Sequence, residues 1–210
     1  MRYRQLGALP VFVSEIGIGT AQLSNTDGTF HGTNHIPVDQ ARTIINQAID
    51  SGVTFFDTAP TYGNTELILG ELSSDTKSQV TIATKAGARK DHTGQISRDF
   101  SESYLTREVD QSLTRLRVDC LDLFQLNKPT HTDLADGRLF DLLHRFQDAG
   151  KIRYSGIVVG SSESALACLR SSSVDCVQIL FNLLFPEHIP IIKEAGDRGK
   201  GVIVRSPLNS

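Results

Sequence analysis

Short apolar runs alternate along this chain with stretches in which apolar residues recur every three or four positions. The runs are rich in β-branched and aromatic residues, which is typical of buried strands. They occupy residues 16–20, 53–56, 80–84, 121–126, 152–159, 174–180 and 202–204. Parallel neighbours in a sheet need a long crossover between them, and that crossover is usually a helix. The alternation therefore predicts an α/β protein with seven parallel strands.

Helical stripes fill the segments between these strands. The first one follows a long polar loop, runs from Ala41 to Ile49 on one face, and ends at Gly52. Further stripes lie at residues 105–116, 139–146, 165–169 and 191–195. Ser162 precedes one of them in the position of an N-cap. Residues 2–14 are expected to form a small β-hairpin ahead of the first parallel strand.

The loops that follow the strands differ from those that precede them. Short joints marked by glycine lead from helix to strand, whereas long polar loops follow strands at residues 21–37, 86–101 and 127–136. Long loops at the carboxyl ends of parallel strands build the active face of a (β/α) barrel. A doubly wound open sheet is the alternative, but IGTAQ at residues 18–22 is not its Gly-rich phosphate loop. The barrel is therefore the favoured architecture.

Length and charge limit the remaining classes. The 210 residues suit a single domain, and residues 1–210 contain no linker or repeat that would divide them. A net charge of -3, from 24 acidic and 21 basic residues, does not favour nucleic acid as a partner. The chain has no apolar run of membrane-spanning length and no secretory signal core, and its three cysteines fit a reducing compartment. We expect a cytoplasmic protein that binds neither nucleic acid nor membrane.

Three residues at strand ends could carry acid–base chemistry. In FFDTAPTYG, Asp57 ends a predicted strand and Tyr62 follows five residues later, while Lys85 ends the run VTIATK. A lysine at a barrel mouth points into a confined site unless it extends outward. An ammonium beside a phenol stabilises the phenolate, which would make Tyr62 a usable acid or base. The alternative interpretation is a structural ion pair with a hydrogen-bonded tyrosine.

Seven blocks of sequence stand in collinear order over almost the whole chain. They are VSEIGIGT (13–20), GVTFFDTAPTYGNTELILGE (52–71), VTIATKAG (80–87), SLTRLRVDCLDLFQL (112–126), GKIRYSGI (150–157), VQILFNLL (177–184) and GVIVRSPL (201–208). Together they resemble the aldo-keto reductase superfamily. The resemblance implies a (β/α)8 TIM barrel and an enzyme in which NADPH delivers hydride to a carbonyl while a tyrosine supplies the proton.

The resemblance also assigns roles to individual residues. In that family the site is a tetrad of Asp, Tyr, Lys and His, and the first three carry over by motif to Asp57, Tyr62 and Lys85. The positions that the resemblance places at the NADP(H) cofactor are Gly19, Thr20, Asp57, Gln178, Ser206 and Leu208. Gln178 falls in the block that contacts the nicotinamide end, and Ser206 opens the segment leading toward the pyrophosphate.

The sequence departs from the family's pattern at two places. Asn127, in Leu-Asn-Lys-Pro, stands where the family has its catalytic histidine. An asparagine can donate a hydrogen bond to a carbonyl oxygen and so orient it, but cannot take up a proton. Val158 and Val159 stand where a Ser-Asn-like pair holds the nicotinamide carboxamide. Both changes weaken the redox machinery and spare the Asp, Tyr and Lys.

A third departure is that the sequence stops at Ser210, after the seventh predicted strand. A complete (β/α)8 barrel takes about 250 residues. We therefore expect a domain without the last β/α unit, the region that in the family grips the adenosine and the 2′-phosphate. Open edges on the first and seventh strands need a cover, which a second copy of this chain or a longer natural chain would supply. The sequence leaves both alternatives open.

The histidines add one alternative for the missing imidazole. Four of them lie in strand-to-helix loops: His31, His35, His92 and His131. His131 is close enough in sequence to the Asn position to replace the lost ring. Their spacing does not match a metal site, so no metal is predicted. The loop at residues 21–37 is expected to shape the substrate pocket.

Three functions follow from these residues. The leading one is NADPH-dependent reduction of an aldehyde or ketone, with Tyr62 as proton donor, Lys85 beside it, Asp57 holding Lys85, and Asn127 orienting the carbonyl. The second is a lyase, dehydratase, cyclase or isomerase that uses Tyr62 and Lys85 for proton transfer without redox chemistry. The third is a non-catalytic barrel subunit that uses an open strand edge to bind a partner.

Overall fold

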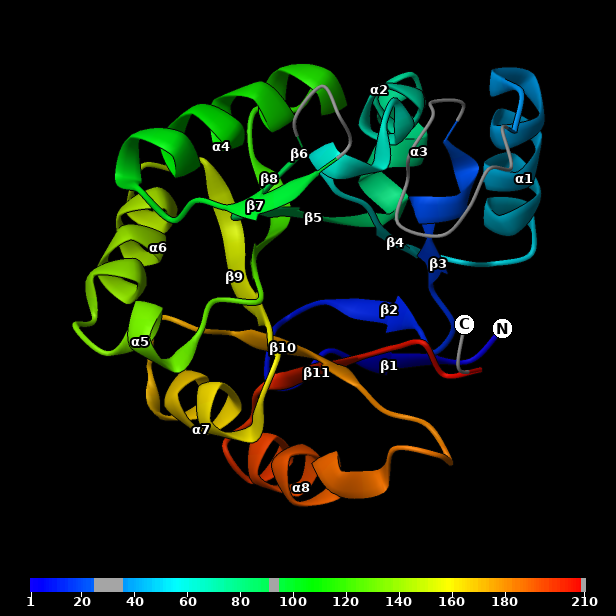
Figure 1. The fold of residues 1–210 in the computed structure, drawn as a ribbon. Coiled ribbons are helices and arrows are strands. Elements are labelled where there is room, and N and C mark those ends of the chain that lie inside the picture. The colour runs from blue at the N-terminus through cyan, green and yellow to red at the C-terminus, as the bar shows by residue number, and fades with distance from the viewer. Residues whose placement is uncertain (25–35, 91–94, 209–210) are drawn as a thin grey trace.

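In a computed structural model of the chain, a parallel sheet of seven strands curls into the larger part of a barrel (Figure 1). The structure describes residues 1–24, 36–90 and 95–208. The parallel strands are β3 (Ile18–Gly19), β4 (Phe55–Asp57), β5 (Thr81–Ala86), β8 (Leu121–Asn127), β9 (Ile152–Val158), β10 (Cys176–Leu180) and β11 (Gly201–Arg205). All seven coincide with the apolar runs, so the predicted strand number and the barrel-type α/β class are confirmed.

The order of the strands excludes the doubly wound alternative. They pair in the order β11-β10-β9-β8-β5-β4-β3, which is the order of the sequence read backwards. A doubly wound sheet reverses its strand order at a switch point. Without a reversal, every right-handed crossover places its helix on the same face, and the sheet curls away from that helical layer. Strands β3 and β11 lie at the two edges of this sheet.

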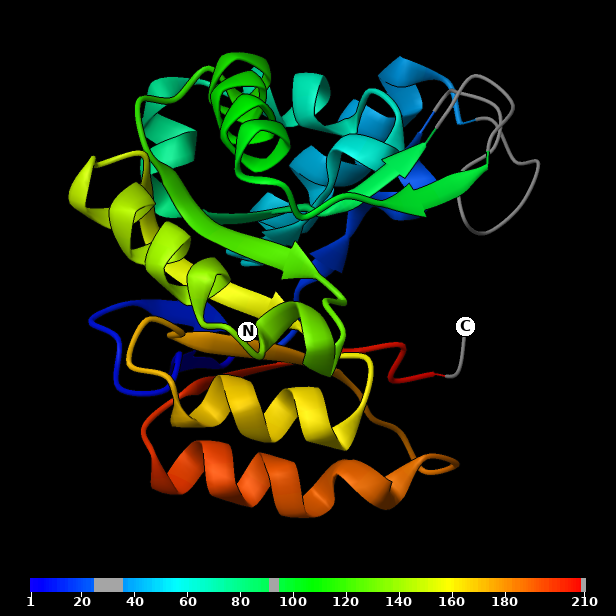
Figure 2. The ribbon, with the colours of Figure 1, turned by 60° about the vertical axis from the view of Figure 1, so that its left-hand side comes forward.

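Helices cover the outer face of the curled sheet (Figure 1). They are α1 (Val38–Asp50), α2 (Thr65–Gly70), α3 (Ser74–Gln79), α4 (Glu102–Leu116), α5 (His131–Leu134), α6 (Arg138–Asp148), α7 (Ser162–Arg170) and α8 (Ile189–Asp197). Helices α7 and α8 lie side by side (Figure 2).

The N-cap of α7 is Ser161, which accepts a hydrogen bond from the Ser164 N–H. The prediction of Ser162 was wrong by one residue, because two consecutive serines give the same pattern. Among the described residues, no helix could cross a membrane.

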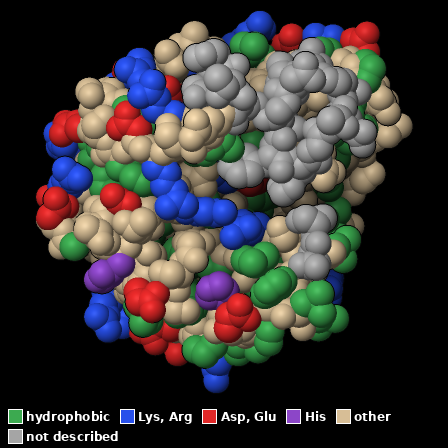
Figure 3. Space-filling view, viewed as in Figure 1, with side chains coloured by type: hydrophobic (Ala, Val, Ile, Leu, Met, Phe, Trp, Pro, Cys, Tyr) green, Lys and Arg blue, Asp and Glu red, His purple; other side chains and the backbone are tan. Residues whose placement is uncertain are grey.

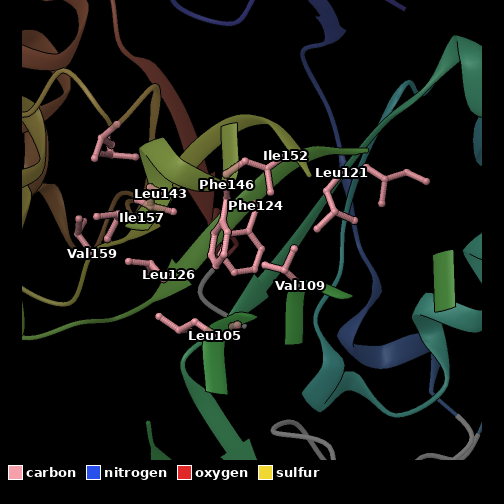
Figure 4. Packing of buried hydrophobic residues seen from close by; sticks show 14 of the residues in the cluster. Leu105, Val109, Leu121, Phe124, Leu126, Leu143, Phe146, Ile152, Ile157 and Val159 are labelled. Carbon is pink, nitrogen blue, oxygen red and sulfur yellow. The ribbon is translucent and has the colours of Figure 1, made fainter. Parts of the chain in front are cut away.

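The main core lies between the sheet and this helical layer (Figure 4). Alternate strand residues such as Phe124, Leu126 and Ile157 point outward into it and meet the apolar stripes of the helices. The ring of Phe124 packs edge to face against that of Phe146 on α6, with 6.1 Å between the ring centroids. Edge-to-face packing is favourable beyond simple burial. The outward-facing strand residues thus pack against the helices, and the inward-facing ones line the interior of the barrel.

A second, smaller core fills one end of the interior. The predicted N-terminal hairpin is present as the antiparallel strands β1 (Tyr3–Gln5) and β2 (Phe12–Ser14). Its residues Leu6 and Val13 pack against inward-facing residues of four parallel strands, which are Phe55, Ala83, Leu123 and Cys176. The hairpin therefore closes the amino-terminal end of the strands with apolar side chains. The carboxyl-terminal end is left for polar ones.

A second hairpin stands in the loop predicted at residues 86–101. Strands β6 (Ala88–Lys90) and β7 (Ile96–Arg98) pair antiparallel beyond the end of β5. Their sequences, ARK and ISR, lack the apolar alternation that indicates a strand, so the sequence analysis missed them. Gly87 permits the turn, with a φ of +104° and no room for a side chain, since an added Cβ would lie 2.3 Å from the Phe100 ring.

Candidate active site

Four of the seven parallel strands change from apolar to polar at the same end of the interior. Side chains two positions apart on a strand point to the same face. Two positions after the apolar residues of the inner core, the chain places four polar residues: Asp57 on β4, Lys85 on β5, Gln125 on β8 and Gln178 on β10. The period of two therefore brings four hydrogen-bonding side chains to the carboxyl ends of the strands, where barrel active sites lie.

Asp57 and Lys85 form the ion pair that the sequence predicted. The Nζ of Lys85 lies 2.6 Å from Oδ2 of Asp57 and donates a second hydrogen bond, at 2.9 Å, to the carbonyl oxygen of Thr58. The Lys85 side chain is 3% exposed and that of Asp57 17% exposed. Lys85 therefore points into the interior and does not extend outward. A buried charge of this kind requires a partner.

Two amides hold the other oxygen of Asp57. The Nε2 atoms of Gln125 and Gln178 donate to Oδ1 at 3.0 Å and 3.1 Å. Gln125 was not predicted, although its place as a polar residue inside the apolar run at residues 121–126 is a signal for an inward-facing polar group. Since both oxygens of the carboxylate are engaged, its orientation toward Lys85 is fixed.

Tyr62 lies above the ammonium of Lys85. It ends a short 3₁₀ turn (Pro60–Tyr62), and the Nζ of Lys85 lies 5.0 Å from the centroid of its ring. Burial by itself lowers the pKa of Lys85, but the Asp57 carboxylate and the Tyr62 hydroxyl more than offset this, so the pKa is raised. Lys85 is therefore a permanent cation at neutral pH beside a half-buried phenol. The structure thus brings all three predicted residues together.

Asn127 ends β8 at the rim of the same site and is half-buried. Within the described part of the chain, no hydrogen bond uses its side-chain amide, so the amide can donate to a ligand. His131 does not approach this position. It is the exposed first residue of α5, and its electrostatic interaction is with Glu163 on α7. Within the described contacts, His131 is therefore not brought to Tyr62 or Lys85.

The residues predicted to contact the cofactor lie in two groups. Gly19 is paired with Asp57 across β3 and β4, and a Cβ placed on it would meet nothing within 4 Å. A flat ring could therefore approach the backbone there. Thr20 is fully buried, and its hydroxyl donates to the Asp57 carbonyl oxygen at 3.2 Å, so it supports the strand end.

The second group follows β10 and β11. Gln178 lies in the polar layer, while Ser206 follows β11 and its carbonyl oxygen accepts from Nδ2 of Asn182 at 3.0 Å. Leu208 is 90% exposed and has no place in either core. Gly19 and Gln178 are thus adjacent to Asp57, and Ser206 continues from the neighbouring strand. The open backbone at Gly19, beside the polar layer, fits the nicotinamide end of a dinucleotide.

Val158 and Val159 are both buried, at the end of β9 and just after it. Val159 belongs to the outer core, whereas Val158 is paired with Gln178 and Asn127 on the inner face. An apolar residue therefore stands beside the polar layer where the resemblance leads one to expect a polar contact to the carboxamide.

Two predictions fall on segments outside the described residues. The pocket-shaping part of the loop at residues 25–35, with His31 and His35, lies there, as does His92 at residues 91–94. Two surface hollows lie on the outer side of α4 and between α4 and α6. Neither hollow contains a residue of the polar layer. The candidate site is therefore defined by its strand ends.

Comparison with known proteins identifies the family of this fold. The profile of the Aldo/keto reductase family matches residues 15–210. The chain is 30% identical over 222 residues to the uncharacterized oxidoreductase YqkF of Bacillus subtilis, covering 100% of this chain and 69% of YqkF. It is 26% identical over 205 residues to the Schizosaccharomyces pombe aldo-keto reductase yakc, whose name specifies NADP(+), covering 93% of this chain and 58% of yakc.

A solved structure supports the same conclusion. The aldo-keto reductase AKR11C1 from Bacillus halodurans, in its holo form, superimposes with a TM-score of 0.83 at 28% identity. The match covers 100% of this chain and 67% of AKR11C1. Fold, profile and relatives thus confirm the predicted superfamily and enzyme class, and the chain belongs to the Aldo/keto reductase family of oxidoreductases.

Proposed function

We propose that this protein reduces an aldehyde or ketone to an alcohol with NADPH as the hydride donor. The observation that carries the proposal is the buried Asp57–Lys85 pair beneath the ring of Tyr62. A fixed cation beside a phenol stabilises the phenolate that remains after Tyr62 gives its proton to the carbonyl oxygen. Asp57 keeps Lys85 in place, and Gln125 and Gln178 keep Asp57 in place.

Asn127 is proposed to orient the carbonyl. Its amide stands at the rim of the site without a hydrogen-bond partner among the described residues, and a carbonyl oxygen could accept from it. Because asparagine neither gains nor loses a proton, Tyr62 is the acid in this scheme. NADPH would supply the hydride, and its nicotinamide end would be held near Gly19 and Gln178. The name of the yakc relative supports NADP as the cofactor.

One observation favours a second candidate. Val158 lies on the inner face beside Gln178, and two valines offer no hydrogen bond to a carboxamide. A site with a weakened nicotinamide contact and a retained Tyr62–Lys85 pair also suits proton transfer on a carbonyl substrate without redox chemistry, as in a lyase or isomerase. Cofactor binding separates the two candidates.

The first experiment is a titration of the full chain with NADPH, in which nicotinamide fluorescence and calorimetry measure binding. Binding in the micromolar range, which is about 8 kcal/mol, is expected together with NADPH oxidation by aldehydes. A folded protein that binds no NADPH but isomerises or dehydrates carbonyl compounds would replace the first candidate by the second. A folded protein that neither reduces carbonyl compounds with NADPH nor isomerises or dehydrates them would contradict both candidates.

The Tyr62→Phe variant tests the proposed acid. Removal of a positioned general acid costs about 10²-fold to 10⁴-fold in turnover, and NADPH affinity should stay close to that of the unaltered protein. Tyr3→Phe is the matched control, since the Tyr3 hydroxyl bonds the Gly52 carbonyl oxygen on the surface at 3.0 Å. Turnover of Tyr62→Phe equal to that of Tyr3→Phe would remove Tyr62 from the mechanism.

A further inference from the structure

Three basic residues lie at separate strand ends around the mouth of the candidate site. Arg205 is the last residue of β11, two positions after Ile203, which packs against the inner core, so both face the interior. Lys128 follows β8, and its Cβ lies 3.8 Å from the position a Cβ would take on Gly160 after β9. Arg98 ends β7. Figure 3 shows Lys and Arg side chains near the middle of this face.

Lys128 is half-buried and lies within reach of the charges of both Arg205 and Arg98. Burial lowers the pKa of Lys128, and the charges of Arg205 and Arg98 lower it further. Within the part of the chain that the structure describes, none of the three forms an ion pair. The buried Nε of Arg205 has no hydrogen-bond partner among these residues. Like charges held together in a partly buried place repel, and an anion there would relieve the repulsion.

The backbone around this cluster is held in a conformation that most residues avoid. Lys128 has a φ of +58° and Ser206, which follows Arg205, a φ of +53°. The Lys128 N–H bonds the Val158 carbonyl oxygen at 2.9 Å, and Asn182 holds the Ser206 carbonyl oxygen at 3.0 Å. Left-handed backbone in residues other than glycine is uncommon and concentrates at binding sites. The two turns thus hold the backbone at Lys128 and directly after Arg205 in a defined conformation.

The cluster adjoins the proposed proton donor. Burial lowers the pKa of Arg205, and the Tyr62 hydroxyl partly offsets this, so the two side chains are near each other at the carboxyl ends of the strands. We infer that Arg98, Lys128 and Arg205 form an anion-binding site that recognises a carboxylate or phosphate group on the carbonyl substrate. This inference rests on the proposed carbonyl reduction and adds the substrate class to it.

Carboxylate and phosphate both fit the chemistry of the cluster. Arginine presents paired N–H donors that match two oxygens of either anion, and lysine adds a compact point charge. The three residues come from different elements, so they can surround an anion that enters from solvent. A neutral aldehyde would leave their charges uncompensated. The site is therefore expected to prefer a carbonyl compound with an acidic group over its neutral analogue.

A matched pair of substrates measures this preference. We would compare kcat/KM for para-carboxybenzaldehyde with that for its methyl ester, which differs only in the masked charge. Lys128→Gln is expected to lower the ratio of the two values about tenfold, which corresponds to ~1.4 kcal/mol. Arg98→Gln should also lower this ratio. Because Arg98 is exposed, its replacement leaves the packing of the core unchanged. Para-formylphenyl phosphate in the same assay distinguishes phosphate from carboxylate.

Lys151→Gln is the control for loss of one positive charge. Lys151 precedes β9 at the opposite end of the strands and pairs with Asp110 at the surface. It should leave the ratio unchanged. The preference should also fall with ionic strength, because the pairs that form are only partly shielded from solvent.

A binding measurement without turnover keeps this inference separate from the proposed function. Calorimetry with para-(hydroxymethyl)benzoate and its methyl ester needs neither cofactor nor chemistry. Tighter binding of the acid, reduced in Lys128→Gln, supports the anion site even if no carbonyl is reduced. Equal binding of acid and ester, or an effect of Lys128→Gln on NADPH affinity alone, overturns it even if the enzyme reduces neutral aldehydes well.

Discussion

Asp57 and Lys85 depend on each other unequally. Lys85 is 3% exposed and has no other carboxylate partner among the described residues, whereas Asp57 also accepts from two glutamine amides. We predict that Asp57→Asn destabilises the fold by about 3 kcal/mol, because it leaves a buried ammonium without a countercharge. Lys85→Met should cost less, because the carboxylate keeps its two amide donors. Urea unfolding of both variants measures the difference.

The prediction concerns which of the two substitutions lowers the free energy of unfolding more. A larger loss for Lys85→Met than for Asp57→Asn would mean that the amides do not satisfy the carboxylate. The same pair is proposed to serve catalysis, so both variants should also lose turnover. Stability and activity are therefore expected to fall together in Asp57→Asn and to separate in Lys85→Met.

Packing between elements depends on close approach at one glycine. Gly70 ends α2 where that helix meets α4, and an added Cβ would lie 2.1 Å from the carbonyl oxygen of Arg115. We predict that Gly70→Ala lowers the free energy of unfolding by about 1 to 3 kcal/mol, because backbone must move to admit the methyl group. Thermal or urea denaturation checks the value.

Gly196 provides the contrasting substitution. It lies in the last turn of α8, and an added Cβ would meet nothing within 4 Å. Alanine there should be neutral or stabilising, by up to about 1 kcal/mol, because it favours the helical backbone. If Gly70→Ala proved as harmless as Gly196→Ala, the helices α2 and α4 would not pack as closely as described.

For the whole molecule, four buried groups predict a loss of stability in alkali. Burial raises the pKa of the Cys168 thiol from 9.0 to about 12, that of Cys176 likewise, and that of the Tyr104 hydroxyl from 10.0 to about 12. The pKa of Lys85 is also raised. A raised folded-state pKa contributes stability that is complete below the unfolded value and lost as the pH rises toward the folded one.

We therefore expect the free energy of unfolding to be level up to about pH 9 and to decline above it. Cys168→Ala should make the decline shallower, because it removes one of the groups that the unfolded chain ionises first. Cys120→Ala should change the slope less, since Cys120 is only half-buried. Urea titrations under reducing conditions at a series of pH values provide the measurement. A stability that rises above pH 9 would contradict the assignment of these buried groups.

Periodic patterns predicted most of the fold. The seven apolar runs became the seven parallel strands because a strand buried on both faces must be apolar along its length. Hairpin β6–β7 was missed for the converse reason, since its polar residues are paired through their backbones and leave no pattern in the side chains. Ser161 was missed as a cap because its neighbour is also a serine.

Local sequence alone determined which residues face inward, and therefore that Asp57 and Lys85 stand at strand ends and that Tyr62 follows in the loop after one of them. Only the tertiary structure decided what meets them. Gln125 and Gln178 are 68 and 121 residues away from Asp57, and they reach its carboxylate because the sheet curls. The same curvature places Arg205, at the end of β11, near both Lys128 after β8 and Tyr62 after β4. Curvature results from strand pairing and helix packing over the whole chain, so no short segment of sequence encodes it.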